Sequence, residues 1–268
     1  MGDLNHDNLI DIIIGYSGTN SIGVFLNSDR GTFKNQVIYA MDNAIPHSIS
    51  VIDLNQDNRL DVIVTNQGIS NIGVLLGYGN GTFGQIKMYV TGSLSTTSLA
   101  IGDFNKDQRI DLIVLNNDTS SINILFGSFE GFSDQTTELN GYWPSSLAIG
   151  DFNSDNRLDI VVVDRDSNGV SVLLGHGDGS FSKQVSYPTG NRSVFVVIGD
   201  FNNDTYMDIA VANVETDHVG VFLGYGNYSF AAQITSRTGK SPRSLAAAHF
   251  NTDDYLDIVV ADFVDDTV

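Results

Sequence analysis

The sequence has no cysteine and few basic residues, and both absences narrow the class of protein. Without cysteine there can be no disulfide, no thiol nucleophile and no zinc–thiolate site. Only 13 Lys and Arg stand against 32 Asp and Glu, which gives a formal net charge of −19 and a pI near 4.2. A field of that sign repels nucleic acid and anionic membrane surfaces. We therefore expect neither as a partner.

Long apolar runs and proline-rich or low-complexity tracts are also absent. No apolar run reaches the roughly 18 residues of a membrane span, so we expect no membrane insertion by this chain. With 41% hydrophobic and 10% aromatic residues, the sequence can still bury a core. We expect one repeat domain over residues 1–268. Its units begin near residues 1, 47, 97, 145, 194 and 243, and the first and last are incomplete.

An acidic loop of nine residues recurs six times in the sequence. The loops, numbered one to six, begin at Asp3, Asp53, Asp103, Asp151, Asp200 and His249, at spacings of 50, 50, 48, 49 and 49 residues. Positions 1, 3, 5 and 9 carry side-chain oxygen, except where His249 takes position 1. Clustered hard oxygen ligands suit Ca²⁺. The predicted calcium ligands are Asp3, Asn5, Asp7, Asp11, Asp53, Asn55, Asp57, Asp61, Asp103, Asn105, Asp107, Asp111, Asp151, Asn153, Asp155, Asp159, Asp200, Asn202, Asp204, Asp208, Asn251, Asp253 and Asp257.

The other positions of the acidic loop also follow a pattern. Position 2 is always Leu or Phe and position 8 is always apolar, so we expect both to anchor the loop in the core. Position 7 varies from Leu to Arg to Tyr. That variation fits a residue that would offer calcium its backbone carbonyl while its side chain is idle.

Between successive acidic loops the sequence predicts short strands. In the third unit, apolar runs at 99–101, 110–115 and 122–126 are separated by Gly, Asn, Asp or Ser. In the second unit, a glycine-rich hairpin signal at 77–83 precedes a more polar run at 85–90. Four strands in a repeat of about 50 residues, without helical spacing, indicate an all-β propeller of four-stranded antiparallel blades. We expect about five to six blades in this chain.

These motifs resemble the FG-GAP repeat of integrin-like proteins, and more closely its VCBS form. The resemblance rests on the Asp-x-Asn-x-Asp-x-x-x-Asp loop, on Phe/Leu-Gly, and on Gly-Asp-Gly-Ser-Phe at 177–181, and it covers essentially the whole chain. It implies a β-propeller, usually of seven blades, in which the loop between the first and second strands binds Ca²⁺. The chain is then expected to be part of a seven-bladed ring.

Position 6 of the acidic loop departs from the family pattern. Family loops often carry Gly there for a left-handed turn, whereas this chain has Asn8, Asn58, Gln108, Asn156, Thr205 and Asp254. Asn and Asp tolerate that conformation, but the β-branched Thr205 does not. We therefore expect the fifth loop to bind calcium more weakly than the second and fourth. The sixth should be weakest, because the imidazole of His249 replaces the first carboxylate.

The sequence shows no catalytic constellation. Its five histidines fall in different repeats, it has no Gly-x-Ser-x-Gly elbow, and metal ligation accounts for its dense carboxylate clusters. The glycines at 79, 81 and 84 match a dinucleotide-binding fingerprint, but a strand-like run follows where that fingerprint needs a helix. We expect a hairpin turn at these glycines and no enzyme in this chain.

Two classes of function remain open. The first is a non-enzymatic, calcium-binding module for protein or glycan recognition or cell adhesion, secreted or in the ectodomain of a membrane-anchored protein. The second is the accessory propeller of a secreted enzyme, acting on polysaccharide or phospholipid, whose catalytic part lies outside this chain. Exposed oxygen-rich loops usually bind calcium weakly, at about 10⁻⁴ to 10⁻³ M, which favours an extracellular setting.

We expect a partner on the face opposite the acidic loops. Alternating strand direction puts the acidic loops and the hairpins between third and fourth strands on one face, and the remaining loops on the other. The repeat-specific residues His47, Trp143, Arg192, Lys240 and Arg243 fall on this second face. Aromatic and Arg side chains are favoured interface anchors. The sequence therefore predicts a protein or carbohydrate ligand there.

Overall fold

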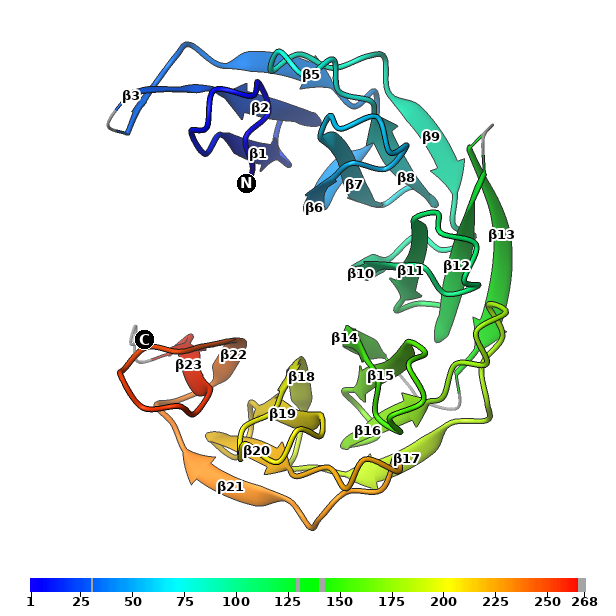
Figure 1. Cartoon of the computed structure of the whole chain (residues 1–268), viewed down its shortest axis with the longest axis vertical. Coiled ribbons are helices and arrows are strands. Elements are labelled where there is room, and N and C mark those ends of the chain that lie inside the picture. Colours follow the sequence, from blue (N-terminus) through cyan, green and yellow to red (C-terminus); the bar gives the residue numbers. More distant parts are fainter. Residues whose placement is uncertain (30, 129–130, 140–142, 265–268) are drawn as a thin grey trace.

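A computed structural model gives the fold and describes residues 1–29, 31–128, 131–139 and 143–264. Throughout these ranges the secondary structure is β, with 23 strands and no helix. Within them, accordingly, no helix has the length and apolar character to cross a membrane. The sheets follow one another in an arc around a central axis, and the first and last sheets lie on either side of an opening (Figure 1). The predicted propeller of four-stranded antiparallel blades is confirmed.

Four blades each contain four strands in sequential order. The second blade contains β6 (Ile45–Ile52), β7 (Asp61–Gln67), β8 (Asn71–Leu75) and β9 (Lys87–Val90). The third contains β10 (Thr96–Gly102), β11 (Asp111–Asn116), β12 (Ser121–Ser128) and β13 (Gly131–Glu138). The fourth contains β14 (Pro144–Gly150), β15 (Asp159–Asp164), β16 (Gly169–Leu173) and β17 (Val185–Pro188). The fifth contains β18 (Ser193–Gly199), β19 (Asp208–Asn213), β20 (His218–Phe222) and β21 (Ile234–Arg237).

The sheets at the two ends of the arc have fewer strands. The first blade pairs β1 (Ile12–Tyr16), β2 (Ser21–Phe25) and β5 (Val37–Ala40), beside a short hairpin of β3 (Asn27–Asp29) and β4 (Thr32–Phe33). The sixth pairs β22 (Pro242–Ala248) with β23 (Asp257–Asp262). Together the described residues therefore form four complete blades and two partial ones.

Burial follows the position of a strand in its blade. The first strands β14, β18 and β22 lie nearest the centre and contact one another around it (Figure 1). The second strands β11, β15 and β19 are buried at every residue, because both faces of the blade are covered by its neighbours. The outermost strand β21 is exposed throughout. The near-continuous apolar runs of the sequence are thus the middle strands of blades.

The hydrophobic core lies between neighbouring blades. Ile113 and Leu115 of the third blade pack with Ile160 and Val162 of the fourth. Other clusters join the second blade to the third and the fourth to the fifth in the same way. Each junction is therefore a small sheet-on-sheet core, and the arc is held together junction by junction.

In three junctions the segment after the third strand bends onto the preceding blade. These segments, residues 77–83, 175–181 and 224–230, are each closed by a bridge between the first glycine and the last phenylalanine. We call them capping hairpins. Each donates a backbone N–H to the carbonyl oxygen at position 2 of the acidic loop in the preceding blade, over 2.9 Å from Gly81 to Leu4, 3.1 Å from Gly179 to Phe104, and 2.9 Å from Tyr228 to Phe152. The acidic loops and capping hairpins therefore share a face, as predicted.

The capping hairpins also bring an aromatic side chain onto the preceding blade. The ring centroids are 5.7 Å apart for Phe83 and Tyr39, 6.2 Å for Phe181 and Phe104, and 5.9 Å for Phe230 and Phe152. Strand β9 follows the first cap, so the glycines at 79, 81 and 84 form the predicted hairpin turn.

The approach of the caps is close enough to require glycine in two of them. Gly81 and Gly179 have φ values of 81° and 85°. A Cβ atom on Gly81 would lie 2.5 Å from Leu26, and one on Gly179 would lie 2.3 Å from Phe126. Glycine thus provides both the left-handed backbone and the space that the cap needs.

The third blade differs at this point. Four residues separate Gly127 from Phe132, whereas five separate the corresponding glycine and phenylalanine in the capping hairpins. Here β12 and β13 stay paired through Gly127 with Phe132 and Ser128 with Gly131. The shorter connection therefore continues its own sheet.

Candidate metal centres

Each acidic loop leads into the second strand of a blade, and in the first five loops position 2 holds it to the core. Leu4, Phe104 and Phe152 are buried there, as predicted. The prediction is wrong for Phe250 at position 2 of the sixth loop, which is 58% exposed because no capping hairpin of a following blade covers it among the described residues. Position 8 packs toward the preceding blade, where Leu60 meets Gly2 and Leu158 meets Gly102.

The prediction that position 8 always sinks into the core is wrong for Ile10 and Met207, which are 57% and 36% exposed. Ile10 belongs to the first sheet, and no described sheet lies on the side where its counterparts pack. Met207 still approaches Gly150, at the edge of the junction. In the first five loops, position 2 is therefore the main anchor.

Backbone N–H groups hold the oxygens of positions 1, 3 and 5 in the first five loops. In the fourth loop, Asp151 accepts the N–H of Asp155 at 3.1 Å and that of Asn156 at 2.7 Å. Asn153 accepts the N–H of Asp155 at 3.2 Å, and Asp155 accepts that of Arg157 at 2.9 Å. The same bonds recur from the first loop to the fifth. The structure thus brings together the predicted ligands at these three positions.

Two residues in each of these five loops have a left-handed backbone. Position 6 does so, as expected, with φ between 60° and 74°. Position 4 does so as well, which the sequence reasoning missed, at His6, Gln56, Lys106, Ser154 and Asn203. The sequence offers only a weak signal for this, since none of the five is β-branched. The two left-handed residues fold the loop back on itself, which allows position 1 to accept the N–H groups of positions 5 and 6.

Thr205 takes the left-handed conformation that it was expected not to tolerate, with φ of 74°. Its side chain is exposed, so Thr205→Gly removes backbone strain without removing packing. We expect this substitution to raise the free energy of unfolding by about 0.5–1 kcal/mol, measured by urea denaturation in chelator. Asn156→Gly is the matched control and should gain less, because Asn already tolerates φ of 60°. A loss of stability in Thr205→Gly would contradict the strain.

Position 9 lies deeper than the other predicted ligands and joins the loop to the rest of its blade. Asp159 is fully buried. Its Oδ2 accepts the N–H of Phe152 at 2.8 Å, and its Oδ1 accepts the N–H of Gly175 at 2.8 Å. Equivalent pairs occur at Asp11, Asp61, Asp111 and Asp208. Both oxygens of position 9 therefore already stabilise the fold, whatever they contribute to a metal.

The carboxylates of a loop disfavour one another's charge. Burial raises the pKa of Asp159 to about 6, against the opposing effect of the N–H groups of Gly175 and Phe152, and the charges of Asp155 and Asp151 raise it further. Burial likewise raises the pKa of position 9 in the second, third and fifth loops.

Cationic side chains compensate little of this charge. Arg59 lies 2.5 Å from Asp57 and lowers the pKa of that carboxyl by hydrogen bonding. Arg157 lies 3.9 Å from Asp155. Both ion pairs join position 7 of a loop to position 5 of the same loop.

The donor set fits Ca²⁺ in type but not through acidic residues alone. In the part of the chain that the structure describes, no three His, Cys, Asp or Glu side chains gather as a metal centre. A cation would therefore need the Asn oxygen of position 3 and the carbonyl of position 7 beside the carboxylates of positions 1 and 5. All of these are hard oxygen donors, and their excess negative charge suits a divalent cation.

The sixth loop is built differently. The Nδ1 of His249 lies 2.9 Å from the carbonyl oxygen of Tyr255, so position 1 contacts its own loop through the imidazole. The Nδ2 of Asn251 donates to Asp257 at 3.2 Å, which brings positions 3 and 9 together. Asp253 accepts the N–H of Tyr255, as in the other loops. Asp254, at position 6 of this loop, does not have a left-handed backbone. This loop therefore lacks both the first carboxylate and the fold-back of the other five.

The opposite face carries the residues predicted to meet a partner. Trp143 precedes β14, is 54% exposed and has φ of 58°, which is rare for a bulky side chain. Arg192, before β18, has φ of 56° and lies 3.5 Å from Glu215. Arg243 stacks on the ring of Phe263 with 5.3 Å to its centroid, and His47 is exposed on β6. The structure spreads these residues over four blades and does not gather them into one pocket.

Comparison with known proteins accounts for the repeating loop. The family model for the FG-GAP-like repeat matches residues 3–64, 53–114, 103–162, 151–211 and 200–260. Each match begins at position 1 of an acidic loop, and together the matches cover nearly the whole chain. The chain belongs to the FG-GAP-like repeat family. A search of curated proteins finds no sequence match to this FG-GAP-like repeat protein.

Solved structures of similar fold share little sequence with this FG-GAP-like repeat protein. A protein of unknown function from Desulfotomaculum acetoxidans is 15% identical, with a TM-score of 0.66 over 95% of this chain and 76% of its own. A lectin from Agrocybe aegerita that recognises non-reducing terminal N-acetylglucosamine is 15% identical, with 0.64 over 94% and 74%. A periplasmic gluconolactonase from Pseudomonas aeruginosa is 15% identical, with 0.65 over 96% and 71%. At this identity, the likeness concerns the fold alone.

Proposed function

We propose that this chain is a non-enzymatic recognition module whose first five acidic loops bind Ca²⁺ as a structural ion. The observation that carries the proposal is the recurrence of one loop geometry. In five loops, two left-handed residues fold the backbone so that positions 1, 3 and 5 place hard oxygens together. Their negative charge is largely uncompensated, so a divalent cation would stabilise the loop.

The place of the loops in the fold supports a structural role for the ion. In the fourth loop, position 2 accepts an N–H from the capping hairpin of the next blade, and position 9 accepts the N–H of Gly175, where the capping hairpin of its own blade begins. A cation bound at positions 1, 3, 5 and 7 would fix the loop that carries both contacts. We propose that calcium thereby stiffens the junctions between blades.

The recognition surface we propose is the face opposite the acidic loops. Trp143 combines high exposure with an unfavourable backbone conformation, and such strain persists where the surrounding structure imposes it, often at ligand sites. Exposed Trp and Arg side chains supply anchors for protein and for carbohydrate. A similar fold is used for sugar recognition by the Agrocybe aegerita lectin. Weak calcium sites would be filled outside the cell, so we place the module there.

A calcium titration by calorimetry on the full chain tests the metal sites. We expect about five weak sites, each with a Kd of about 10⁻⁴ to 10⁻³ M. Asp155→Asn should remove one of them, because it takes a charge from the fourth loop. Asp178→Asn is the matched control, since Asp178 lies in a capping hairpin, where it accepts the N–H of Ser180. Absence of calcium binding, or equal effects of the two variants, would contradict the proposal.

Glycan and protein arrays test the recognition surface. Trp143→Ala and Arg243→Ala should each weaken binding of a captured ligand, whereas Asp178→Asn on the other face should not. Ligand binding unchanged in both alanine variants would exclude this face.

A further inference from the structure

We propose that the second and third acidic loops bind calcium as a coupled pair, joined by the side chain of Gln56 as a positioning residue. This rests on the proposed function, because the ions concerned are those of the same loops. Neighbouring loops meet in two ways in this arc. At some junctions a side-chain amide joins one loop directly to the next, and at others a capping hairpin lies between them.

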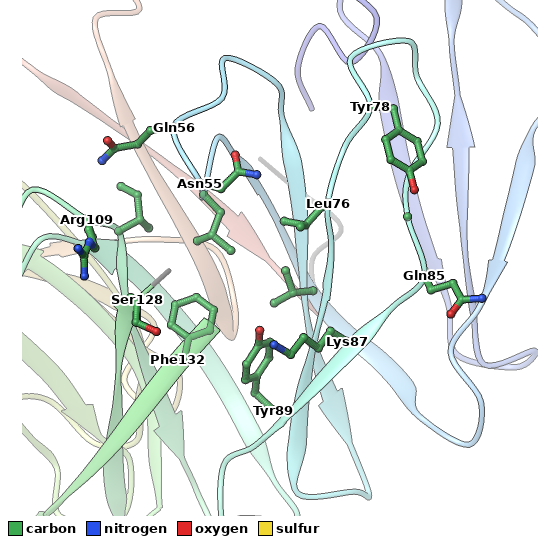
Figure 2. A pocket seen from close by; sticks show the side chains of 15 residues that line it. Asn55, Gln56, Leu76, Tyr78, Gln85, Lys87, Tyr89, Arg109, Ser128 and Phe132 are labelled. Carbon is green, nitrogen blue, oxygen red and sulfur yellow. The ribbon is translucent and has the colours of Figure 1, made fainter. Parts of the chain in front are cut away.

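The link is a hydrogen bond between the second and third loops. The Nε2 of Gln56, at position 4 of the second loop, donates to the backbone carbonyl oxygen of Gln108, at position 6 of the third. Figure 2 shows the side chain of Gln56 directed away from Asn55, toward the third blade, where Arg109 lies. Because the two bonded residues are 52 positions apart in the sequence, the bond joins one blade to the next.

The carbonyl that Gln56 reaches belongs to a peptide group that also holds a predicted ligand. The N–H of this peptide group, on Arg109, donates to the Oδ1 of Asp107 at 2.9 Å. Asp107 is position 5 of the third loop. Two hydrogen bonds through one peptide group therefore connect the second loop to a predicted calcium ligand of the third. Bonds in such a chain polarise and strengthen one another.

At its other end, Gln56 is positioned by the ligands of its own loop. It lies between Asn55 and Asp57 in the sequence and has the left-handed backbone of position 4, with φ of 61°. A cation bound to these two neighbours would fix the backbone at Gln56. Ordering one loop then reduces the entropic cost of ordering the other, which gives positive coupling without a larger conformational change. The effect is reciprocal, so the third loop favours binding at the second to the same degree.

The same chain of bonds joins the fifth and sixth loops. The Nδ2 of Asn203, at position 4 of the fifth loop, donates to the carbonyl oxygen of Asp254, at position 6 of the sixth, at 2.9 Å. The N–H of Tyr255, in that peptide group, donates to Asp253 at 3.0 Å. This second occurrence shows that a side-chain amide at position 4 makes the link. The sixth loop lacks the first carboxylate, so the second and third loops are the better pair to test.

Between the third and fourth loops, a capping hairpin takes the place of the link. A Cβ atom on Gly177 of the hairpin would lie 3.4 Å from Lys106, at position 4 of the third loop, and 3.4 Å from Arg157, at position 7 of the fourth. The hairpin's own bond to the third loop ends at Phe104, at position 2, which is an anchor and not a predicted ligand. The third loop therefore has one neighbour bonded to it by an amide and another separated from it by a hairpin.

This difference allows a matched test by a calcium titration of the ¹⁵N-labelled full chain, followed by NMR. The N–H of Gln108 donates to Asp103 at 2.8 Å, so its resonance reports calcium at the third loop. Asp57→Asn and Asp155→Asn each take one charge from a neighbouring loop. We expect the calcium midpoint of the third loop to be about two- to fivefold higher in Asp57→Asn than in Asp155→Asn, the effect of one hydrogen bond.

Removing the link itself completes the comparison as a double-mutant cycle. Gln56→Ala keeps every predicted ligand and should raise the midpoint of the third loop by a similar factor. In the Gln56→Ala background, Asp57→Asn and Asp155→Asn should have equal effects on that loop. Ser154→Ala is the control at position 4 of the fourth loop and should leave the third loop's midpoint unchanged.

A measurement without metal tests the geometry separately. In EDTA, Gln56→Ala should speed hydrogen exchange of the Arg109 N–H, because one of the two bonds that hold its peptide group is lost. Exchange of the Arg157 N–H, at position 7 of the fourth loop, should not change. Unchanged exchange at Arg109 would overturn the link.

The outcomes also separate this coupling from the proposed function. Equal third-loop midpoints in Asp57→Asn and Asp155→Asn, in a chain that still binds calcium, would overturn the coupling and leave the calcium sites in place. A chain that shows no calcium-dependent shift at any acidic loop would contradict the proposed function, and the coupling with it.

Discussion

Asp159→Ala is expected to lower the free energy of unfolding by about 2–4 kcal/mol, the largest effect of any substitution at a predicted ligand position. The carboxylate is fully buried and accepts the N–H groups of Phe152 and Gly175. Its removal leaves two buried donors without an acceptor, each costing about 1–3 kcal/mol. Relief from burying a negative charge offsets part of that loss. Urea denaturation in chelator measures the effect without any contribution from bound metal.

Asp155→Ala is the control, because it removes a predicted calcium ligand that contributes little to the stability of the fold. Asp155 is exposed and accepts the N–H of Arg157 at the surface of the same loop, so its loss should cost less than about 1 kcal/mol in chelator. Asp159→Asn, which keeps one acceptor oxygen, should fall between the two variants. If Asp159→Ala were no more destabilising than Asp155→Ala, position 9 would have no special structural role.

Chelation of calcium is expected to produce the largest change of all. When each of five sites is tenfold saturated, binding to the folded state contributes about 1.4 kcal/mol per site, or about 7 kcal/mol together. That is comparable with the whole stability of an ordinary domain. For a chain of 268 residues, the corresponding fall in Tm is about 15–25 °C. Differential scanning calorimetry in EDTA and in millimolar calcium measures it.

Ionic strength must be matched in that comparison, because salt alone screens the self-repulsion of a protein with a net charge of −19. Sodium chloride at the same ionic strength should recover only a small part of the lost Tm. A Tm that is the same in EDTA and in calcium would show that the acidic loops are polar turns rather than metal sites.

The fold was largely predictable because its determinants are local and repeated. The strand-length apolar runs, the turn residues between them and the six acidic loops are visible within each unit of about 50 residues. One acidic loop alone would not establish a motif. The recurrence of the same spacing after Asp3, Asp53 and Asp103 does, because chance would not repeat it. The number of blades in a closed ring remains a prediction, because the first and last sheets lie on either side of an opening and do not close the ring (Figure 1).

The features that were missed depend on contacts between distant residues. The burial of Asp159 follows from its bond to Gly175, which lies 16 residues further along the chain. The continued pairing of β12 with β13 accompanies a connection one residue shorter between Gly127 and Phe132, a difference that is visible in the sequence. Its consequence is visible only once the caps are known to cover the preceding blade. In each case the sequence signal lies within a few residues, but its structural effect depends on a contact with residues that are distant in the sequence.

The capping hairpins also set an order in which the arc can be completed. The donors Gly81, Gly179 and Tyr228 lie 77, 75 and 76 residues after the carbonyls they reach at Leu4, Phe104 and Phe152. During synthesis on the ribosome, an acidic loop therefore emerges well before the segment that covers it. Chains are made and folded from the N-terminus. Each blade is thus finished by its successor, and assembly of the arc has a direction that its repetitive architecture does not reveal.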